Sequence, residues 1–226
     1  FTNHIMKVRE LINTNYIGDI LGINATNSGS AHTPDFPDWI HIKKYSGGGS
    51  IMDHTSHCVD IMRWIMDSEV VEVYAEAEGQ MRKWGVEDTA QISLLFDNGV
   101  ISTIEATWVR LPHNPEMFDV TFDIFGTKAT ISTKLMNSEK IIVRQEIPDI
   151  ITDQYGDGCG KLQTDPMGSY GGIYDKGVFG EFYKAIMKRP NIGADILDGI
   201  KADEVAFASY LSIRKGNPVK LPIVDI

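Results

Sequence analysis

One run of the sequence, GGGSIMDHTSHCVD from Gly47 to Asp60, concentrates residue types that could move a proton. Asp53 and His57 are four positions apart, and Asp60 follows three positions later. On a helix, at 100° per residue, these side chains fall within about 60° of one another on one face. A carboxylate beside an imidazole can take up and release a proton near neutral pH. The spacing therefore predicts a proton-transfer site on a helix that begins just after the glycines.

The apolar residues of this segment define a second face. They cluster away from Asp53 and His57, and they are Ile51, Cys58, Ile61, Met62 and Ile65. This pattern predicts a helix over 50–66 that buries one stripe in the core and presents the polar stripe outside it. Carboxylate–histidine pairs at this spacing also occur on surfaces without a function, so the spacing alone leaves both interpretations open.

The same segment could instead hold a metal, because His54, His57 and Cys58 could supply nitrogen and sulfur ligands, with Asp53 as an oxygen ligand. However, His54 and Cys58 lie about 60° and 100° round the helix from His57. The sequence has no second ligand cluster such as C-x-x-C, which zinc sites usually need. We therefore expect no metal at this site.

The pattern G-G-G-x-x-x-D-x-x-x-H-x-x-D resembles the signature of the Gfo/Idh/MocA family of NAD(P)-dependent sugar and cyclitol dehydrogenases. The resemblance continues, in the family's order, over nearly the whole chain. The further matching segments are Lys7-Val-Arg-Glu-Leu-Ile before Ile17-Gly-Asp-Ile, Val86-Glu-Asp-Thr-Ala, Leu95-Phe-Asp-Asn-Gly99, Phe125-Gly-Thr-Lys128, and Ala206-Phe-Ala-Ser-Tyr-Leu-Ser212 with Gly216-Asn-Pro-Val219. Ala129 stands where the family's G-T-K-G turn has its last glycine.

The resemblance implies a role for each residue of the polar stripe. His57 would be the general acid/base, and Asp53 would share the catalytic site and hydrogen-bond the substrate hydroxyls. Asp60 would either orient His57 or only cap and solvate its helix, and it is also a candidate for substrate binding. Gly48 and Gly49 would let the backbone pass close to the substrate or the nicotinamide, because glycine has no Cβ.

Two residues outside this helix are further candidates for substrate binding. Asn27 follows the first predicted strand and could line a sugar site, although loop asparagines more often form turns or contact solvent. Tyr174 belongs to a long segment, 147–177, that is rich in Gly, Asp and Tyr and has no clear period. Loops of this length are usually functional or disordered, and packing of the tyrosine ring on the domain is an equal alternative.

Family members begin with a Rossmann domain that carries G-x-G-x-x-G and a catalytic lysine in a Glu-Lys-Pro sequence. This chain starts at Phe1, and no G-x-G-x-x-G follows a strand in it. The resemblance therefore predicts that residues 1–226 are one C-terminal domain for substrate binding and oligomerisation, without the Rossmann domain. NAD or NADP would be held mainly by that other domain, and this chain alone would be inactive.

Composition narrows the possible partners. A net charge of −10 argues against nucleic acid and anionic membranes, and no apolar run approaches the ~20 residues of a membrane span. Two cysteines, Cys58 and Cys159, give no disulfide framework, which favours a reducing cytoplasm. The partner that the family resemblance implies is a small polyol or sugar.

The order of the predicted elements is helix, strands, then helices. Helices are expected over 4–15, 50–66, 178–189 and 199–215, the last with Asp198 as its N-cap, and strands over 17–25, 70–77, 89–96, 100–108, 118–125, 129–133 and 140–145. This order predicts an α+β fold with a large antiparallel-rich mixed sheet and helices on one face. The resemblance implies the same fold, that of the dihydrodipicolinate-reductase-like or glucose-fructose-oxidoreductase-like C-terminal domain. The open sheet face, read as still partly apolar, predicts a homodimer or tetramer.

Two other functions stay open at this point. The chain could be a non-catalytic binding or assembly module that keeps the fold, although the intact D-x-x-x-H pair argues against loss of activity. It could also belong to a dehydrogenase that acts on a nucleotide-linked sugar or a keto sugar, and nothing in the sequence separates these substrates.

Overall fold

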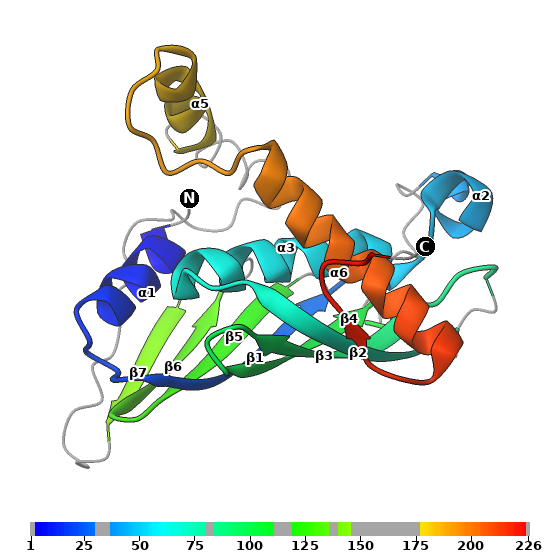
Figure 1. The fold of residues 1–226 in the computed structure, drawn as a ribbon, viewed down its shortest axis with the longest axis horizontal. Helices are drawn as coiled ribbons and strands as arrows, with labels where there is room; N and C mark the ends of the chain where they lie inside the picture. Colours follow the sequence, from blue (N-terminus) through cyan, green and yellow to red (C-terminus); the bar gives the residue numbers. More distant parts are fainter. Residues whose placement is uncertain are drawn as a thin grey trace.

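One large sheet, with helices along one of its faces, forms the body of the molecule in this computed structural model (Figure 1). The structure describes residues 3–29, 37–79, 84–110, 119–135, 140–145 and 177–224. Helices α1 (Asn3–Asn13), α3 (Ser50–Met66) and α6 (Ile196–Lys215) lie on the same side of the sheet. The predicted α+β architecture is therefore confirmed.

The sheet contains eight strands within the described residues, in the order β7-β6-β5-β1-β4-β3-β2-β8. Only β1 and β4 run parallel; every other described neighbouring pair is antiparallel. The strands are β1 (Ile20–Ser28), β2 (Val70–Glu78), β3 (Thr89–Phe96), β4 (Ile101–Thr107), β5 (Asp119–Gly126), β6 (Ala129–Lys134), β7 (Lys140–Gln145) and β8 (Val219–Lys220). The carboxyl ends of β1 and β4 consequently meet at one edge of the sheet.

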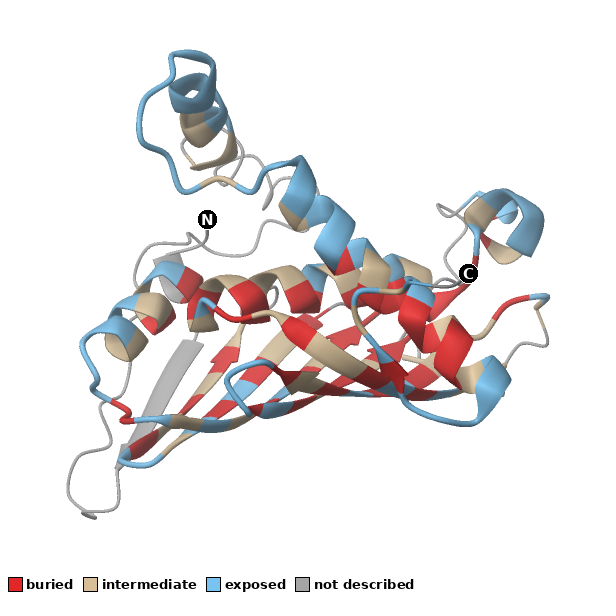
Figure 2. Cartoon of the chain, viewed as in Figure 1, coloured by how far each residue is buried: buried red, intermediate tan, exposed pale blue. Residues whose placement is uncertain are grey.

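The core lies between the sheet and the helices, where Figure 2 shows the buried residues gathered. Along α3, Ile51, Cys58, Met62 and Ile65 are at most 2% exposed, as the apolar pattern predicts. Ile61 is only partly buried; it packs against the core, as the pattern predicts, and it also lines a surface pocket. The stripe is also broader than predicted, because His54 is buried within it.

The outer face of the sheet is more polar than the sequence suggested. Side chains alternate along β4, with Ser102, Ile104 and Ala106 buried on the helix side. The outward side chains of the central strands include threonines, serines and carboxylates. Two apolar side chains, Ile101 and Phe125, are also exposed at one end of this face, where they flank Gly22 of β1.

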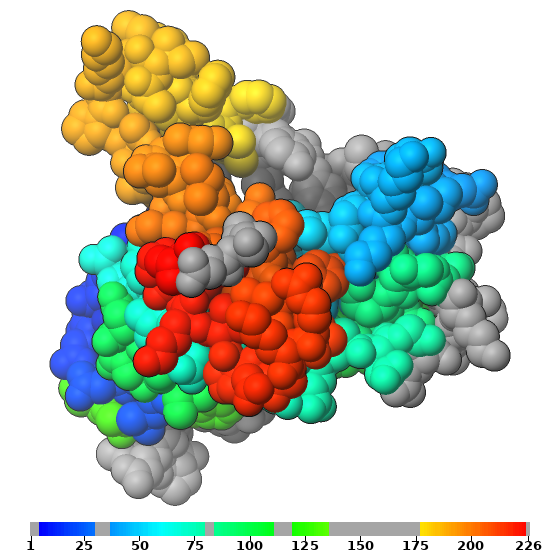
Figure 3. All heavy atoms as spheres, turned by 45° about the vertical axis from the view of Figure 1, so that its right-hand side comes forward, coloured from blue at the N-terminus to red at the C-terminus, as the bar shows by residue number. Residues whose placement is uncertain are grey.

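Two short elements and an arm project from this body. The 3-10 helix η1 (Asp38–His41) and the helix α2 (Lys43–Ser46) precede the glycine run, and the sequence did not predict either. Helix α5 (Phe179–Ile186) and the segment that joins it to α6 stand away from the sheet, in yellow and orange in Figure 3. Most side chains of this arm are exposed.

Some predicted boundaries need correction. The first strand begins at Ile20 and not at Ile17, because Gly18 adopts a left-handed φ of 74° and interrupts the extended backbone. The N-cap of α6 is Asp195 and not Asp198; Asp198 is the third residue of the helix and completes a capping box. Tyr174 and Cys159 lie outside the described residues.

Candidate functional site

The polar stripe of α3 lies above the edge where β1 and β4 end. Asn27 is the next-to-last residue of β1, and Trp108 follows β4 directly; β1 pairs with β4 so that Asn27 lies beside Ala106. The side chains of Asn27 and Trp108 are both buried, on the face of the sheet that α3 covers. The amino-terminal turns of α3 therefore rest on the ends of two adjacent parallel strands, where residues distant in sequence converge.

Glu87 holds the amino terminus of α3. Its Oε1 accepts hydrogen bonds from the backbone N–H of Gly49 (2.9 Å) and Ile51 (3.1 Å) and from the hydroxyl of Tyr210 (2.6 Å). The N–H of Ser50 donates to the backbone carbonyl of the same glutamate. A carboxylate from a distant loop thus satisfies the free N–H groups that open every helix, and its charge suits the positive end of the helix dipole.

This arrangement explains the three glycines. Gly47 ends α2 with a left-handed φ of 81°. A Cβ on Gly48 would lie 1.7 Å from the Tyr210 hydroxyl, and one on Gly49 would lie 1.8 Å from the carbonyl oxygen of Glu87. Contacts inside the chain therefore exclude a Cβ at Gly49, and a Cβ at Gly48 would force the Tyr210 side chain to move. Approach of a cofactor to Gly48 and Gly49 stays a prediction, and the structure offers another reason for each.

Two side chains, Trp108 and His54, converge on one oxygen of Asp53. Trp108 Nε1 donates to Asp53 Oδ2 at 2.9 Å, and His54 Nε2 lies 3.1 Å from the same oxygen. Asp53 Oδ1 has no hydrogen-bond partner within the described residues. Partial burial by itself would raise the pKa of Asp53, but the hydrogen bonds and charge of His54, with Trp108 and His57, hold the pKa below its usual value. The carboxylate is therefore ionised at neutral pH.

His54 is locked into the same network from its other side. Its Nδ1 lies 2.8 Å from the backbone oxygen of Asn27, and the Asn27 side chain donates to the carbonyl of His54 at 3.3 Å. Because a carbonyl oxygen can only accept, Nδ1 carries a hydrogen. The predicted substrate-binding role of Asn27 is untested, but its backbone and side chain both fasten this histidine.

His57 is exposed, one turn beyond Asp53, and makes no hydrogen bond within the described residues. It is close enough for its charge to lower the pKa of Asp53. The predicted pair therefore lies together on the open side of α3, with His57 free to meet a ligand. Asp60 forms no described hydrogen bond with His57, but the charge of His57 acts to lower the pKa of Asp60, and the orienting role suggested for Asp60 stays a prediction.

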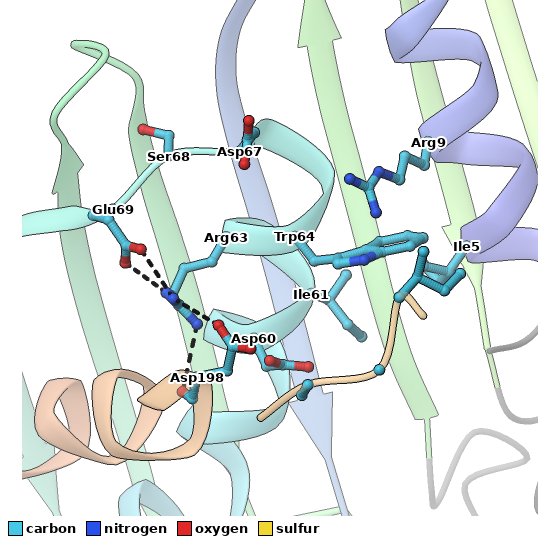
Figure 4. Close-up of a pocket in the computed structure, with 13 residues that line it drawn as sticks. Ile5, Arg9, Asp60, Ile61, Arg63, Trp64, Asp67, Ser68, Glu69 and Asp198 are labelled. Atoms are coloured by element: carbon cyan, nitrogen blue, oxygen red, sulfur yellow. Dashed lines mark hydrogen bonds and ion pairs between the residues drawn. The ribbon is translucent and has the colours of Figure 1, made fainter. Parts of the chain in front are cut away.

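Asp60 instead lines a pocket of about 270 Å³ farther along α3 (Figure 4). Burial raises the pKa of the Asp60 carboxyl; the charge of Arg63 opposes this rise, and Asp198 adds to it. Arg63 spans the pocket floor, donating to Glu69 at 2.7 and 3.0 Å and to Asp198 at 3.1 Å. Asp53 and His57 are not among the residues that line this pocket.

Neither Trp108 nor His54 was identified from the sequence as part of the proton-transfer site. Trp108 is 2% exposed, with Ile40 and Val86 packed around it, and so has the surroundings of a core residue. His54 was considered only as a metal ligand. His54 directly follows Asp53 in the sequence, which could have indicated a contact. However, adjacent residues on a helix point 100° apart, so adjacency alone does not predict that the two side chains meet.

Metal-ligand clusters and membrane-spanning helices are both absent from the described residues. No group of three or more His, Cys, Asp or Glu side chains there is arranged to hold a metal ion. No described helix is both long enough and apolar enough to cross a membrane.

Comparison with known proteins places the chain. The family model for the GFO/IDH/MocA C-terminal domain matches residues 5–132. The chain belongs to the Gfo/Idh/MocA family. It is 26% identical over 225 residues to the uncharacterized oxidoreductase YrbE of Bacillus subtilis, covering 98% of this chain and 60% of that protein. It is 27% identical over 161 residues to the myo-inositol 2-dehydrogenase of Thermotoga maritima, covering 70% of this chain and 43% of that protein.

The fold is shared with solved structures of the family. Levoglucosan dehydrogenase, in complex with NADH and levoglucosan, superposes with a TM-score of 0.76 at 20% identity, covering 95% of this chain and 62% of that one. The Gfo/Idh/MocA chain described here thus spans less than two thirds of the length of these relatives.

Proposed function

We propose that this chain is the substrate-side domain of an NAD(P)-dependent dehydrogenase that oxidises a secondary hydroxyl of a sugar, cyclitol or related polyol. The observation that carries the proposal is the pairing on α3 of an exposed His57 with a fixed, ionised Asp53. Relatives named for myo-inositol and levoglucosan support a polyhydroxylated substrate.

The chemistry divides between two partners. Oxidation of a secondary alcohol removes a hydride from carbon and a proton from oxygen, and a bound nicotinamide would accept the hydride. The proton needs a base near the hydroxyl, and the imidazole of His57 suits this task near neutral pH. Asp53 Oδ1 can accept a hydrogen bond from a neighbouring hydroxyl and so orient the sugar ring.

The described residues of this chain offer no clear cradle for the cofactor. The space beside Gly48 is filled by Tyr210, and that beside Gly49 by the backbone of Glu87. We therefore propose that this chain supplies the base that takes the proton and the groups that bind the substrate hydroxyls. Holding of the nicotinamide by a separate Rossmann domain is part of the proposal.

The test is an oxidation assay with the full-length protein. Cyclitols, pyranoses and anhydrosugars are supplied with NAD⁺ or NADP⁺, and formation of the reduced nicotinamide is followed by its absorbance. In His57→Ala we expect kcat to fall by roughly 10²- to 10⁴-fold, the range for loss of a general base. Ser56→Ala, a neighbour on the same helix, is the matched control and should stay near wild type.

The outcomes separate the candidate functions. Near wild-type turnover by His57→Ala with every accepted substrate would exclude His57 as the base. If the wild-type protein bound polyols in calorimetry but oxidised none with either nicotinamide, the chain would be a binding module. Turnover only with a nucleotide-linked or keto sugar would correct the substrate class and keep the reaction.

A further inference from the structure

The two side chains that meet Asp53 are themselves fixed by the fold. His54 is 8% exposed and held at Nδ1 by the end of β1, as described above. Trp108 is 2% exposed, and its ring meets the His54 ring edge to face with centroids 6.3 Å apart. Neither side chain can turn away without breaking a buried contact, so the geometry of the carboxylate is set in advance of any ligand.

The aromatic packing behind Trp108 reinforces this. His41 stacks on Trp84 with ring centroids 3.7 Å apart, and both rings meet Trp108 edge to face at 6.1 and 6.3 Å. The indole N–H is thereby aimed at α3. Because an indole can only donate, its partner must be an acceptor, and the ionised carboxylate is the strongest acceptor available there.

We propose that His54 and Trp108 are positioning residues: the indole N–H and the imidazole of His54, in the form protonated at both nitrogens, hold Oδ2 of Asp53, so that Oδ1 is left, already oriented, for a substrate hydroxyl. This inference deepens the proposed function and rests on it for the identity of the ligand. It gives the buried histidine a role different from that of His57, which is the group that exchanges the proton.

The contact between His54 and Asp53 depends on the protonation of the histidine. Since Nδ1 of His54 donates to a carbonyl, the contact between Nε2 and Oδ2 is a hydrogen bond only while a further proton lies between them. The groups that face the carboxylate are His54 and His57 from α3 and Trp108 from the end of β4. Removal of either donor leaves Oδ2 partly buried with one partner fewer, which should raise the pKa of Asp53.

The first experiment needs no enzyme activity. Full-length protein labelled with ¹⁵N-tryptophan is titrated with acid, and the indole N–H resonance of Trp108 is assigned by its loss in Trp108→Phe. We expect this resonance to move with the protonation of Asp53, to stop moving in Asp53→Asn, and to move at a pH higher by about one unit in His54→Phe. An indole resonance that is unaffected by Asp53→Asn would overturn the proposal.

The second experiment is kinetic and uses the same variants. His54→Phe and Trp108→Phe should each lower kcat/KM by roughly ten- to a hundredfold through misplacement of the carboxylate, mainly by raising KM. His54→Gln keeps a side-chain donor and should recover part of the loss. Cys58→Ala removes a fully buried neighbour on α3 and controls for disturbed packing; it should lower stability without moving the titration.

The two experiments fail in different ways. If no polyol is oxidised, the proposed function falls, and the titration still tests the positioning of Asp53. If oxidation proceeds but His54→Phe, His54→Gln and Cys58→Ala behave alike in both experiments, His54 is only a packing residue and the positioning role is wrong.

Discussion

At the scale of single residues, Asp53 has two oxygens in different surroundings, and this determines what its replacement should do. One oxygen is engaged by protein donors and the other is available to solvent or ligand. Loss of the charge should therefore affect ligand binding more than folding, because the apolar stripe of α3 remains intact.

We expect Asp53→Asn to raise KM for the polyol by about tenfold or more with a smaller change in kcat, the pattern of a lost binding contact. The pKa of Asp53 lies below its usual value, so the wild-type carboxylate is fully ionised from about pH 5 upward. The ratio of mutant to wild-type KM should thus be the same at about pH 6 and about pH 9. A ratio that grows over this range would mean that Asp53 titrates within it.

The sequence pattern placed Asp53 and His57 on one helix face, but it did not indicate that His54 supports Asp53. Both histidines lie on one helix, three positions apart. What distinguishes them is burial of His54 against Asn27 and Trp108, which the pairing of β1 with β4 brings together. Helical periodicity contains no information on that pairing, so the supporting residues emerged only from the tertiary structure.

At the scale of elements, the amino terminus of α3 is fixed by groups from two distant segments. Glu87 precedes β3, and Tyr210 lies on α6, yet both meet the glycine run. The helix itself was predictable, since the apolar period and the glycines gave its limits of Ser50 and Met66 correctly. The cap was not, because the residue that performs it is 38 positions from Gly49.

The glycines should differ in their tolerance of a methyl group. In Gly49→Ala the new Cβ meets backbone of Glu87, which cannot move easily, whereas in Gly48→Ala it meets the end of the Tyr210 side chain. We expect Gly49→Ala to lower the free energy of unfolding by about 3 kcal/mol or more, and Gly48→Ala to lower it by less. Gly199→Ala, in open space within α6, should gain up to about 1 kcal/mol. Urea unfolding of the three variants measures this order, and equal losses at Gly48 and Gly49 would contradict it.

Arg63 links the end of α3 to the start of α6 through Glu69 and Asp198. Hydrogen bonding by Arg63, helped by Lys201 and opposed by burial, lowers the pKa of Glu69 to about 2. A carboxyl whose folded pKa is depressed stabilises the fold above its unfolded pKa of about 4.3, and this contribution is lost as pH falls toward 2.

We therefore expect Glu69→Gln to destabilise the protein at neutral pH by about 1 kcal/mol, a value reduced for the solvent exposure of Glu69. The difference in stability between Glu69→Gln and wild type should shrink as the pH falls from about 4.3 toward 2. Thermal unfolding at a series of pH values measures it, with Glu72→Gln on β2 as a surface control. A difference that stays constant down to the acid limit would show that the ion pair is not its source.

At the scale of the whole molecule, the helices leave the outer face of the sheet uncovered in Figure 1. The sequence predicted an open face that is still partly apolar, but it overestimated how apolar this face is. On this face Thr103 donates a hydrogen bond to Asn24, and Asp123 accepts one from Ser132. Polar side chains here can therefore form hydrogen bonds with one another or with water. The apolar part is the end occupied by Ile101 and Phe125.

We still expect a homodimer through this face, because a two-fold axis would bring the apolar end against a second copy and close the assembly. Ile101→Asp should convert the dimer to monomer, since an unpaired charge would be buried at its centre. Ile196→Asp is the matched control: Ile196 is 77% exposed and is the first residue of α6, directly after the projecting arm, and α6 lies on the helix side of the sheet. Light scattering at micromolar concentration gives the mass of each variant. Dissociation by Ile196→Asp and not by Ile101→Asp would move the interface to the arm, and a monomeric wild type would exclude both.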